Sequence, residues 1–212
     1  MPPGPPGQGC TRDGAGPGYN PPMPERALRP ATFEDLQAVP DHLVGEIVDG
    51  ELYTSPRPAP IHANAASVLG SDLNAIFQRG RGGPGGWWIP HEPELHLGAD
   101  ALVPDIGGWR RERLPHLPER AHFELPPDWV CEVLSPSTAL LDRARKLPVY
   151  ARAGVPWAWI VDPIQRSVEV FRLREGAWVL DRVAGAAEEV ALPPFEAVAL
   201  RLAELWPEDQ PK

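Results

Sequence analysis

Two carboxylates interrupt apolar stretches of the sequence and are the first candidates for chemistry. Asp105 lies in LVPDI, and Glu132 lies in WVCEVL. An ionised carboxylate is costly to bury unless it is paired. Two such groups on neighbouring strands call for a cation between them, and hard oxygen ligands suit Mg²⁺ or Mn²⁺. Each group alone has a simpler explanation: Asp105 could end a strand, and Glu132 could face solvent from an edge strand.

Lys146 is the third candidate. Of the 20 basic residues, only Lys146 and the terminal Lys212 are lysines. An ammonium differs from a guanidinium in hydration and pKa range, so a lysine in such an arginine-rich chain suggests chemistry. Asp105, Glu132 and Lys146 together suggest metal-dependent phosphodiester hydrolysis, with the carboxylates holding the metal and the lysine stabilising developing charge. The alternative is chance, or an ordinary helical ion pair between Lys146 and Asp142, four residues earlier.

The elements around Glu132 must position these groups. The sequence predicts a strand over 129–134, a helix that is capped by Ser137 or Thr138 and ends at Gly154, and a strand over 155–163. A strand–helix–strand crossover implies parallel pairing of the two strands. Parallel strands are usually covered on both faces, so a solvent-facing Glu132 is disfavoured.

The rest of the chain adds helices and hairpins to this unit. Asp49-Gly50 is a strong hairpin signal, and Thr32 is a suitable N-cap for a short helix. The predicted elements are a helix over 31–39, a hairpin over 46–55, a helix over 58–80, strands over 86–98 and 99–109, and a hairpin over 166–183. We therefore expect an α/β fold with a central mixed sheet flanked by helices, and with added N- and C-terminal β-hairpins.

Composition sets the outer bounds. Residues 1–30 are rich in Pro and Gly and nearly without large apolar side chains, so we expect a disordered tail followed by a single domain over 31–208. No signal peptide or membrane-spanning stretch is expected. Cys10 and Cys131 suggest no disulfide, which fits a cytoplasmic protein.

The net charge of −9 gives no support for nucleic-acid binding, because a negatively charged protein as a whole repels a phosphate backbone. Local arginine clusters could still form one basic face, or could be solvated surface. The tryptophans are interpreted as core or as dimer surface, with an exposed Trp87-Trp88 pair as the expected exception for base stacking. The clusters are Arg79 and Arg81; Arg110, Arg111 and Arg113; and Arg143, Arg145 and Lys146.

Several motifs in series resemble the Uma-two family of restriction endonucleases, within the PD-(D/E)XK nuclease superfamily. The resemblance runs from about residue 33 to residue 206 and implies a restriction-endonuclease-like core. The matching motifs are EIVDGEL (46–52), SPRPAPIH (55–62), VPD (103–105), EVLSPST (132–138), D-x-x-x-K (142–146), YARAGV (150–155), WIVDP (159–163) and VEVFRL (168–173).

The resemblance implies roles for individual residues. Asp105 resembles the aspartate of the PD half-motif, and Glu132 resembles the acidic residue of (D/E)xK. Leu134 stands where that motif has its lysine, so the lysine is displaced onto the following helix, at Lys146. The implied catalytic residues are thus Asp105, Glu132 and Lys146, and the implied metal ligands are Asp105 and Glu132.

Five further residues are expected to support the site. Glu46 would help to hold metal or water, His62 would touch phosphate or the first hairpin, and Glu92 would join the acidic group. Ser135 would position Glu132 by hydrogen bonding, and Asp142 would support Lys146. For His62 and Glu92 a purely structural role is the alternative.

The expected function is a metal-dependent endonuclease that hydrolyses DNA phosphodiester bonds with Mg²⁺ or Mn²⁺, its carboxylates holding the metal and the helix-borne lysine assisting attack by water. The alternative is a catalytically inactive nuclease-fold module that binds nucleic acid or a protein partner. A homodimer through the apolar C-terminal hairpins is expected by analogy with other nucleases of this fold.

Overall fold

The computed structural model describes residues 1, 29–56 and 58–206. The predicted tail over 1–30 lies outside these residues except at its two ends, as does Cys10. Within the described part, no helix is long and apolar enough to cross a membrane.

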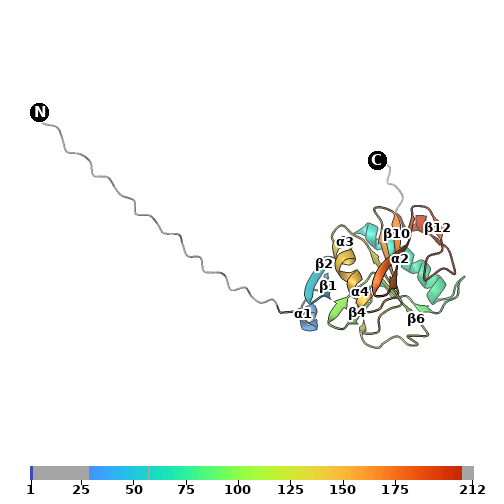
Figure 1. The fold of residues 1–212 in the computed structure, drawn as a ribbon, viewed down its shortest axis with the longest axis horizontal. Coiled ribbons are helices and arrows are strands. Elements are labelled where there is room, and N and C mark those ends of the chain that lie inside the picture. The colour runs from blue at the N-terminus through green and yellow to red at the C-terminus, as the bar shows by residue number, and fades with distance from the viewer. Residues whose placement is uncertain (2–28, 57, 207–212) are drawn as a thin grey trace.

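A six-stranded mixed sheet forms the centre of the fold (Figure 1). Its strand order is β11-β10-β9-β8-β6-β3. The predicted crossover is confirmed, because β8 and β9 pair in parallel while their neighbours pair antiparallel. The strands are β3 (Trp87–Trp88), β6 (Ile106–Arg110), β8 (Trp129–Val133), β9 (Trp157–Asp162), β10 (Ser167–Arg174) and β11 (Ala177–Gly185).

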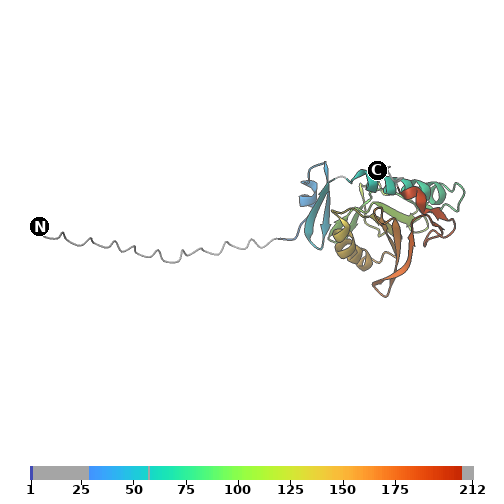
Figure 2. The same cartoon turned by 90° about the horizontal axis from the view of Figure 1, so that it is seen from above.

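Helical segments cover both faces of this sheet (Figure 2). Leu69 and Phe77 of the first segment pack with Trp129, Cys131 and Val133, the odd-numbered residues of β8. The even-numbered face of β8 packs against the second segment. Because strand side chains alternate between faces, Glu132 points towards that second segment. The two segments are α2 (Pro60–Leu73) with η1 (Asn74–Gln78), and α3 (Ala139–Leu141) with η2 (Asp142–Lys146) and α4 (Leu147–Arg152).

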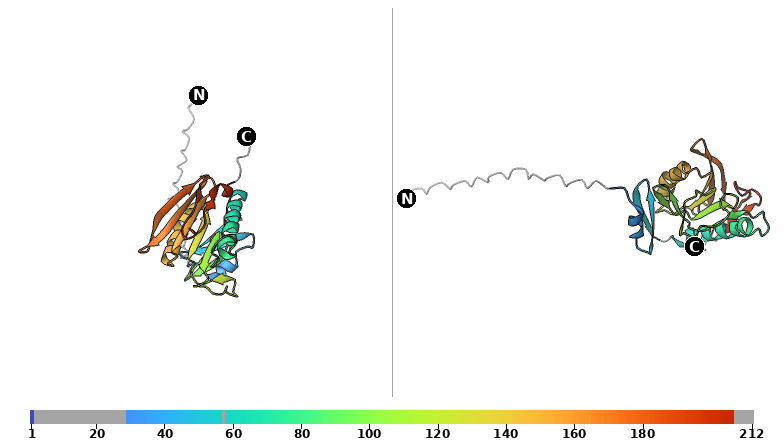
Figure 3. Two further views of the ribbon diagram at one scale, coloured as in Figure 1. Left: turned by 90° about the vertical axis from the view of Figure 1, so that its right-hand side faces the viewer. Right: turned by 90° about the horizontal axis from the view of Figure 1, so that it is seen from below.

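A second, five-stranded sheet stands at one end of the molecule beside α1 (Figure 3). Its order is β2-β1-β5-β4-β7. The predicted turn is confirmed at Asp49 and Gly50, whose φ angles of 52° and 79° are those of a type I′ hairpin. Thr32 caps α1 in a capping box with Asp35, as predicted. The elements are α1 (Phe33–Gln37), β1 (Leu43–Val48), β2 (Glu51–Pro56), β4 (Glu94–Leu97), β5 (Asp100–Leu102) and β7 (His122–Phe123).

The two strands predicted over 86–98 and 99–109 are wrong in extent. Each is divided into two strands that belong to different sheets: β3 and β4, then β5 and β6. Pro90, Pro93 and Pro104 lie at the divisions. Proline cannot donate to a strand ladder, so the chain leaves one sheet and enters the other at these positions.

The helix after β8 also differs from the prediction. Its N-cap Thr138 makes no side-chain cap; instead the Ser135 hydroxyl accepts the Thr138 N–H at 3.2 Å. The middle of the helix, η2, is π-helical, and the Leu147 N–H bonds to the Asp142 carbonyl five residues back. Pro148 follows directly and has no N–H to offer the preceding turn. Gly154 ends the helix, as predicted, with φ 77°.

The C-terminal elements complete the core on the α2 side of the central sheet. The hairpin predicted over 166–183 is confirmed as β10–β11, which turns at Glu175 and Gly176. Leu200, Leu202 and Leu205 then pack into the same core cluster as α2. The last described elements are β12 (Glu189–Val190), β13 (Leu200–Arg201) and η3 (Leu202–Leu205).

Candidate active site

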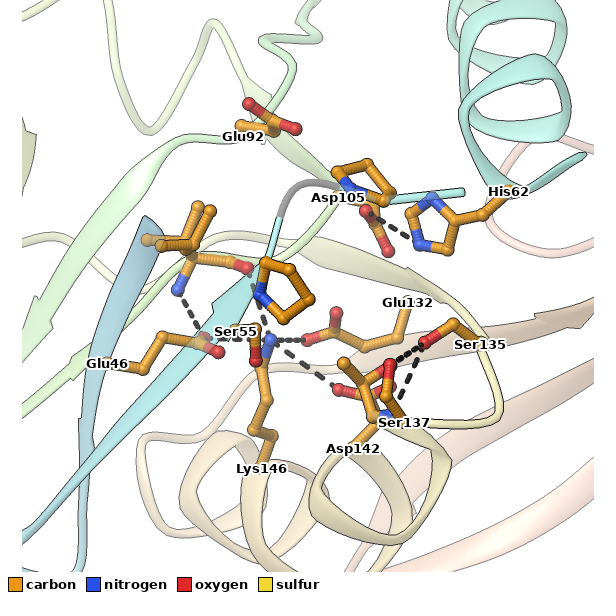
Figure 4. A pocket seen from close by; sticks show the side chains of 15 residues that line it. Glu46, Ser55, His62, Glu92, Asp105, Glu132, Ser135, Ser137, Asp142 and Lys146 are labelled. Atoms are coloured by element: carbon orange, nitrogen blue, oxygen red, sulfur yellow. Dashed lines mark hydrogen bonds and ion pairs between the residues drawn. The ribbon is translucent and has the colours of Figure 1, made fainter. Parts of the chain in front are cut away.

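Lys146 is the centre of a buried polar cluster between β8, the η2 helix and β1 (Figure 4). Its Nζ lies 2.9 Å from Glu132 Oε1, 2.8 Å from Glu46 Oε1 and 3.7 Å from Asp142 Oδ1. It also donates to the Val103 carbonyl at 3.1 Å. Burial alone would lower the pKa of Lys146, but attraction by the three carboxylates outweighs it and raises that pKa well above its ordinary value. The ammonium therefore stays charged.

Glu132 is 2% exposed and is held from two sides through one oxygen. Its Oε1 takes the Lys146 contact and also accepts the Tyr150 hydroxyl at 2.6 Å. In Figure 4 the other carboxylate oxygen points away from Lys146, into the cavity. Burial raises the pKa of Glu132 well above its ordinary range; Lys146 counters this effect and the neighbouring carboxylates add to it.

Asp105 follows β5 and enters the same cavity from the opposite side (Figure 4). Its Oδ2 accepts the Val133 N–H at 2.7 Å, which ties it to the strand that carries Glu132. Its Oδ1 lies 3.2 Å from His62 Nε2. Burial would lower the pKa of His62, but the bond and the charge of Asp105 raise it above its ordinary value. The structure thus pairs His62 with Asp105, and not with the first hairpin as one interpretation had it.

The supporting residues take different positions. Glu46 accepts the Val103 N–H at 2.8 Å besides its Lys146 contact. Asp142 is 3% exposed, and burial raises its pKa to about 6. Glu92 lines the cavity beyond Asp105 in a left-handed conformation with φ 45°. The expected contact of Ser135 with Glu132 is wrong: Ser135 bonds to Ser137 and Thr138, where it serves the start of the helix.

Tyr150 is the residue that the sequence reasoning missed. It lies four residues after Lys146, so the two side chains share a helix face. Burial of its hydroxyl raises the pKa of Tyr150 well above its ordinary value, and the neighbouring Glu132 carboxylate raises it further. The signal was therefore present in the helical spacing of Asp142, Lys146 and Tyr150.

The cavity is small, with a volume of about 80 Å³. Five acidic side chains line it, against one lysine and one histidine: Glu46, Glu92, Asp105, Glu132 and Asp142, with Lys146 and His62. The acidic side chains outnumber the basic ones, so the positive charge of Lys146 does not balance the carboxylates of the cavity.

The donor set suits a hard divalent cation. Mg²⁺ is commonly held by one or two carboxylates, with water and substrate phosphate completing its octahedron. Asp105 and Glu132 provide two such groups. Among the described residues, no three side chains of this cavity have donor atoms all within 4.8 Å of one another, so Mg²⁺ would keep several waters here.

The predicted aromatic and basic surfaces are largely engaged in packing. Trp87, expected to be exposed, is 4% exposed and packs on Phe195. Arg111 lies 4.0 Å above the Trp88 ring and donates to the Trp87 carbonyl. Arg113 and Arg143 are paired with Asp128 and Glu169. Arg111, Arg113 and Arg143 therefore contact an aromatic ring or carboxylates of the chain itself.

Comparison with known proteins points to a nuclease family. The family model Uma2, described as "Putative restriction endonuclease", matches residues 30–203. A crystal structure of a "putative nuclease belonging to DUF820" from Anabaena variabilis ATCC 29413 superposes with a TM-score of 0.68 at 22% identity, covering 83% of this chain and 97% of that one. The likeness shows a shared nuclease-like fold. Comparison with curated proteins found no significant match.

Proposed function

Because the chain belongs to the Uma2 family of restriction-endonuclease-like proteins, we propose that it hydrolyses DNA phosphodiester bonds with the help of Mg²⁺ or Mn²⁺. One observation carries the proposal: Lys146, Glu132 and Asp105 come from three separate elements and line a single cavity. A water oxygen attacks phosphorus, one P–O ester bond breaks, and the proton of the water passes to the leaving oxygen.

Lys146 is proposed to stabilise the charge that develops on the phosphoryl oxygens. A fixed, buried ammonium acts strongly there because little solvent screens it and no reorganisation is needed at the moment of reaction. Tyr150 and Glu46 are proposed as positioning residues. Tyr150 fixes the orientation of the Glu132 carboxylate, and Glu46 holds the Lys146 ammonium beside the Val103 carbonyl.

Asp105 and Glu132 are proposed to hold the metal ion, which would polarise the scissile phosphate and lower the pKa of a bound water. Two observations support this metal site: acidic side chains outnumber basic ones in the cavity, and the second carboxylate oxygen of Glu132 points away from Lys146. His62 is proposed to fix the Asp105 carboxylate through the 3.2 Å contact, which leaves that side chain less freedom to rotate away.

A non-cutting nucleic-acid or protein-binding module is the second candidate. One observation favours it: Lys146 already compensates Glu132, so the ion-pair cluster could be purely structural. A net charge of −9 points the same way. The two functions differ in a single measurable outcome, the cleavage of a phosphodiester bond.

Nicking of supercoiled plasmid by the full chain tests the proposal. We expect cleavage with Mg²⁺ or Mn²⁺, none with EDTA, and a loss of at least about 100-fold in rate in Glu132→Gln and Lys146→Met, because each removes charge at the reacting centre. Glu196→Gln, an exposed acidic residue on a C-terminal loop, is the matched control and should cleave normally.

The variants are first compared by circular dichroism and thermal unfolding, so that a folding defect is recognised. Wild-type protein that binds Mg²⁺ but leaves plasmid and linear DNA intact would favour the binding module. Equal cleavage by all four proteins would contradict the assignment of the site.

The homodimer is also part of the proposal. Val179, Leu180 and Val183 of β11 are 46–55% exposed on an edge strand of the central sheet. Apolar side chains on a sheet edge are suited to self-association. Sedimentation velocity of the wild type and of Val183→Lys measures whether the chain dimerises through this strand.

A further inference from the structure

A second cluster of metal-binding side chains lies on the five-stranded sheet. Glu94 and His96 are two residues apart on β4, so they point to the same face. His122 of β7 is the register partner of Glu94 on the neighbouring parallel strand. Two strands thus place one carboxylate and two imidazoles on one small area. Nothing in the proposed nuclease reaction uses these three residues.

Their donor atoms already lie close together. The donor atoms of Glu94, His96 and His122 all lie within 4.8 Å of one another, and theirs is the one such group of three found in the part of the chain that the structure describes. In a tetrahedral site with Zn–N and Zn–O bonds near 2.1 Å, two ligand atoms lie about 3.4 Å apart. Donor atoms up to 4.8 Å apart would therefore have to approach by as much as about 1.4 Å.

The two imidazole rings are stacked in this structure, and one of them would turn out of the stack for both in-plane nitrogen lone pairs to reach a single ion. The His96 and His122 rings stack with centroids 3.8 Å apart and 6° between their planes. Phe33 of α1 stacks on the other side of His96 at 4.3 Å. His96 Nε2 lies 2.6 Å from Glu94 Oε1. The side chains of His96 and His122 are 17% and 27% exposed, so His122, the more exposed of the two, is the ring that would turn.

This cluster is separate from the Lys146 cavity. His96 pairs with Ala101, and Ala101 pairs with Ile47, so these three residues share one face of the sheet. Glu46 precedes Ile47 and therefore points to the opposite face, where Lys146 lies. The sheet itself divides the two groups.

We propose that Glu94, His96 and His122 bind one divalent transition-metal ion, and that Zn²⁺ is the ion that the donor set fits best. Two imidazoles and a carboxylate are a recurrent zinc ligand set, with a water in the fourth position. Hard Mg²⁺ prefers oxygen ligands only. The two sites thus differ in the class of cation they accept.

The ion would tie β7 to β4. β7 has only two residues and follows an irregular segment over 111–121. Two ladder partners hold it to the sheet, so a bond through His122 would add a strong constraint. The consequence is a structural role: Zn²⁺ should order the segment that leads into β7.

Zinc affinity of the full chain tests the proposal directly, measured by competition with a chromogenic chelator and by metal content after gel filtration. We expect one Zn²⁺ per chain. Loss of a ligand should weaken the affinity by at least about 100-fold in His96→Ala and in His122→Ala. Glu94→Gln, which keeps the side-chain shape, should weaken it as well. His116→Ala, an exposed histidine of the same segment, should leave it unchanged.

Two controls make the result decisive. Glu132→Gln should keep full zinc affinity; if it alone loses zinc, the ion sits in the Lys146 cavity and the proposal is overturned. Equal affinity in wild type and all three ligand variants would overturn it too. As a second readout, Zn²⁺ should slow trypsin cleavage after Arg113 and Arg120 in the wild type but not in His122→Ala.

Discussion

At the scale of single residues, the main feature of the cavity is a set of buried carboxylates, whose ionisation costs free energy because they are removed from water. Glu132 and Asp142 both have raised pKa values because burial removes water from them, and Lys146 compensates only in part. A protein that needed only stability would do better with apolar residues of similar volume at these positions. The cluster is therefore better explained by a role in chemistry than by a contribution to the fold.

Asp142 allows this electrostatic cost to be measured. Its pKa rises from 3.8 in the unfolded chain to about 6 in the fold. Between these values the unfolded state has already lost the proton that the folded state keeps, so the free energy of unfolding falls as pH rises. Asp142→Asn removes that dependence. We expect its stability relative to wild type to increase by about 1 kcal/mol between pH 5 and pH 8.

Urea unfolding at the two pH values is the measurement, with Asp181→Asn on the exposed face of β11 as the control. The control should show the same pH dependence as the wild type. If the stability of Asp142→Asn relative to wild type stays constant or falls between pH 5 and pH 8, then the pKa of Asp142 is not raised in the folded protein.

The sequence identified the principal residues of the cavity but not their pairing. Asp105, Glu132 and Lys146 stood out because charge interrupted apolar runs and because lysine was rare. The contact of Lys146 with Glu46, one hundred residues earlier in the chain, depends on how β1 packs over the helix. Local patterns carry no such long-range information, and for the same reason they could not pair His62 with Asp105.

At the scale of elements, short-range signals were reliable where one turn or cap decides the structure. The capping box at Thr32, the Asp49-Gly50 turn and the parallel crossover were all predicted. The division of strands at prolines and the π-helical turn before Pro148 were not. Pro90, Pro93 and Pro104 mark where a strand ladder is interrupted. Which sheet the chain enters next, and which carbonyl accepts the Leu147 N–H, are decided by tertiary packing.

The Asp49-Gly50 turn determines the hairpin that carries Glu46, so a substitution in this turn tests how much the turn contributes to stability. Gly50 has φ 79°, a conformation that costs an L-residue with a side chain about 1–2 kcal/mol. Gly50→Ala should lower the free energy of unfolding by about that amount. Gly185→Ala, at ordinary φ and with 3.5 Å to its nearest neighbour, is the matched control and should change it little. Chemical denaturation measures both.

The same pair of variants also tests whether the hairpin positions the cavity. If β1 holds Glu46 against Lys146, Gly50→Ala should slow plasmid nicking more than Gly185→Ala does at a temperature where both are folded. Equal nicking rates in the two variants would mean that the cavity tolerates movement of the hairpin.

At the scale of the whole molecule, the charge balance constrains how a nucleic acid could be held. The chain has 29 acidic and 20 basic residues, and Arg113, Arg143 and Arg152 are paired with carboxylates of the chain itself. Few released counterions are then available to drive association with DNA. A divalent cation shared between the acidic cavity and a phosphate would supply the missing attraction.

Binding of DNA should therefore depend on the cation. For a labelled duplex at 0.15 M salt with EDTA, we expect a Kd on the order of 10–100 µM or weaker. Ca²⁺, which also takes oxygen ligands, should tighten it by at least about tenfold, or 1.4 kcal/mol. Glu132→Gln should lose this gain because it loses a ligand charge, and Glu196→Gln should keep it. Fluorescence anisotropy measures the four cases. Tight binding in EDTA that Glu132→Gln leaves unchanged would place the DNA on a basic face away from the cavity, and the charge argument would then fail.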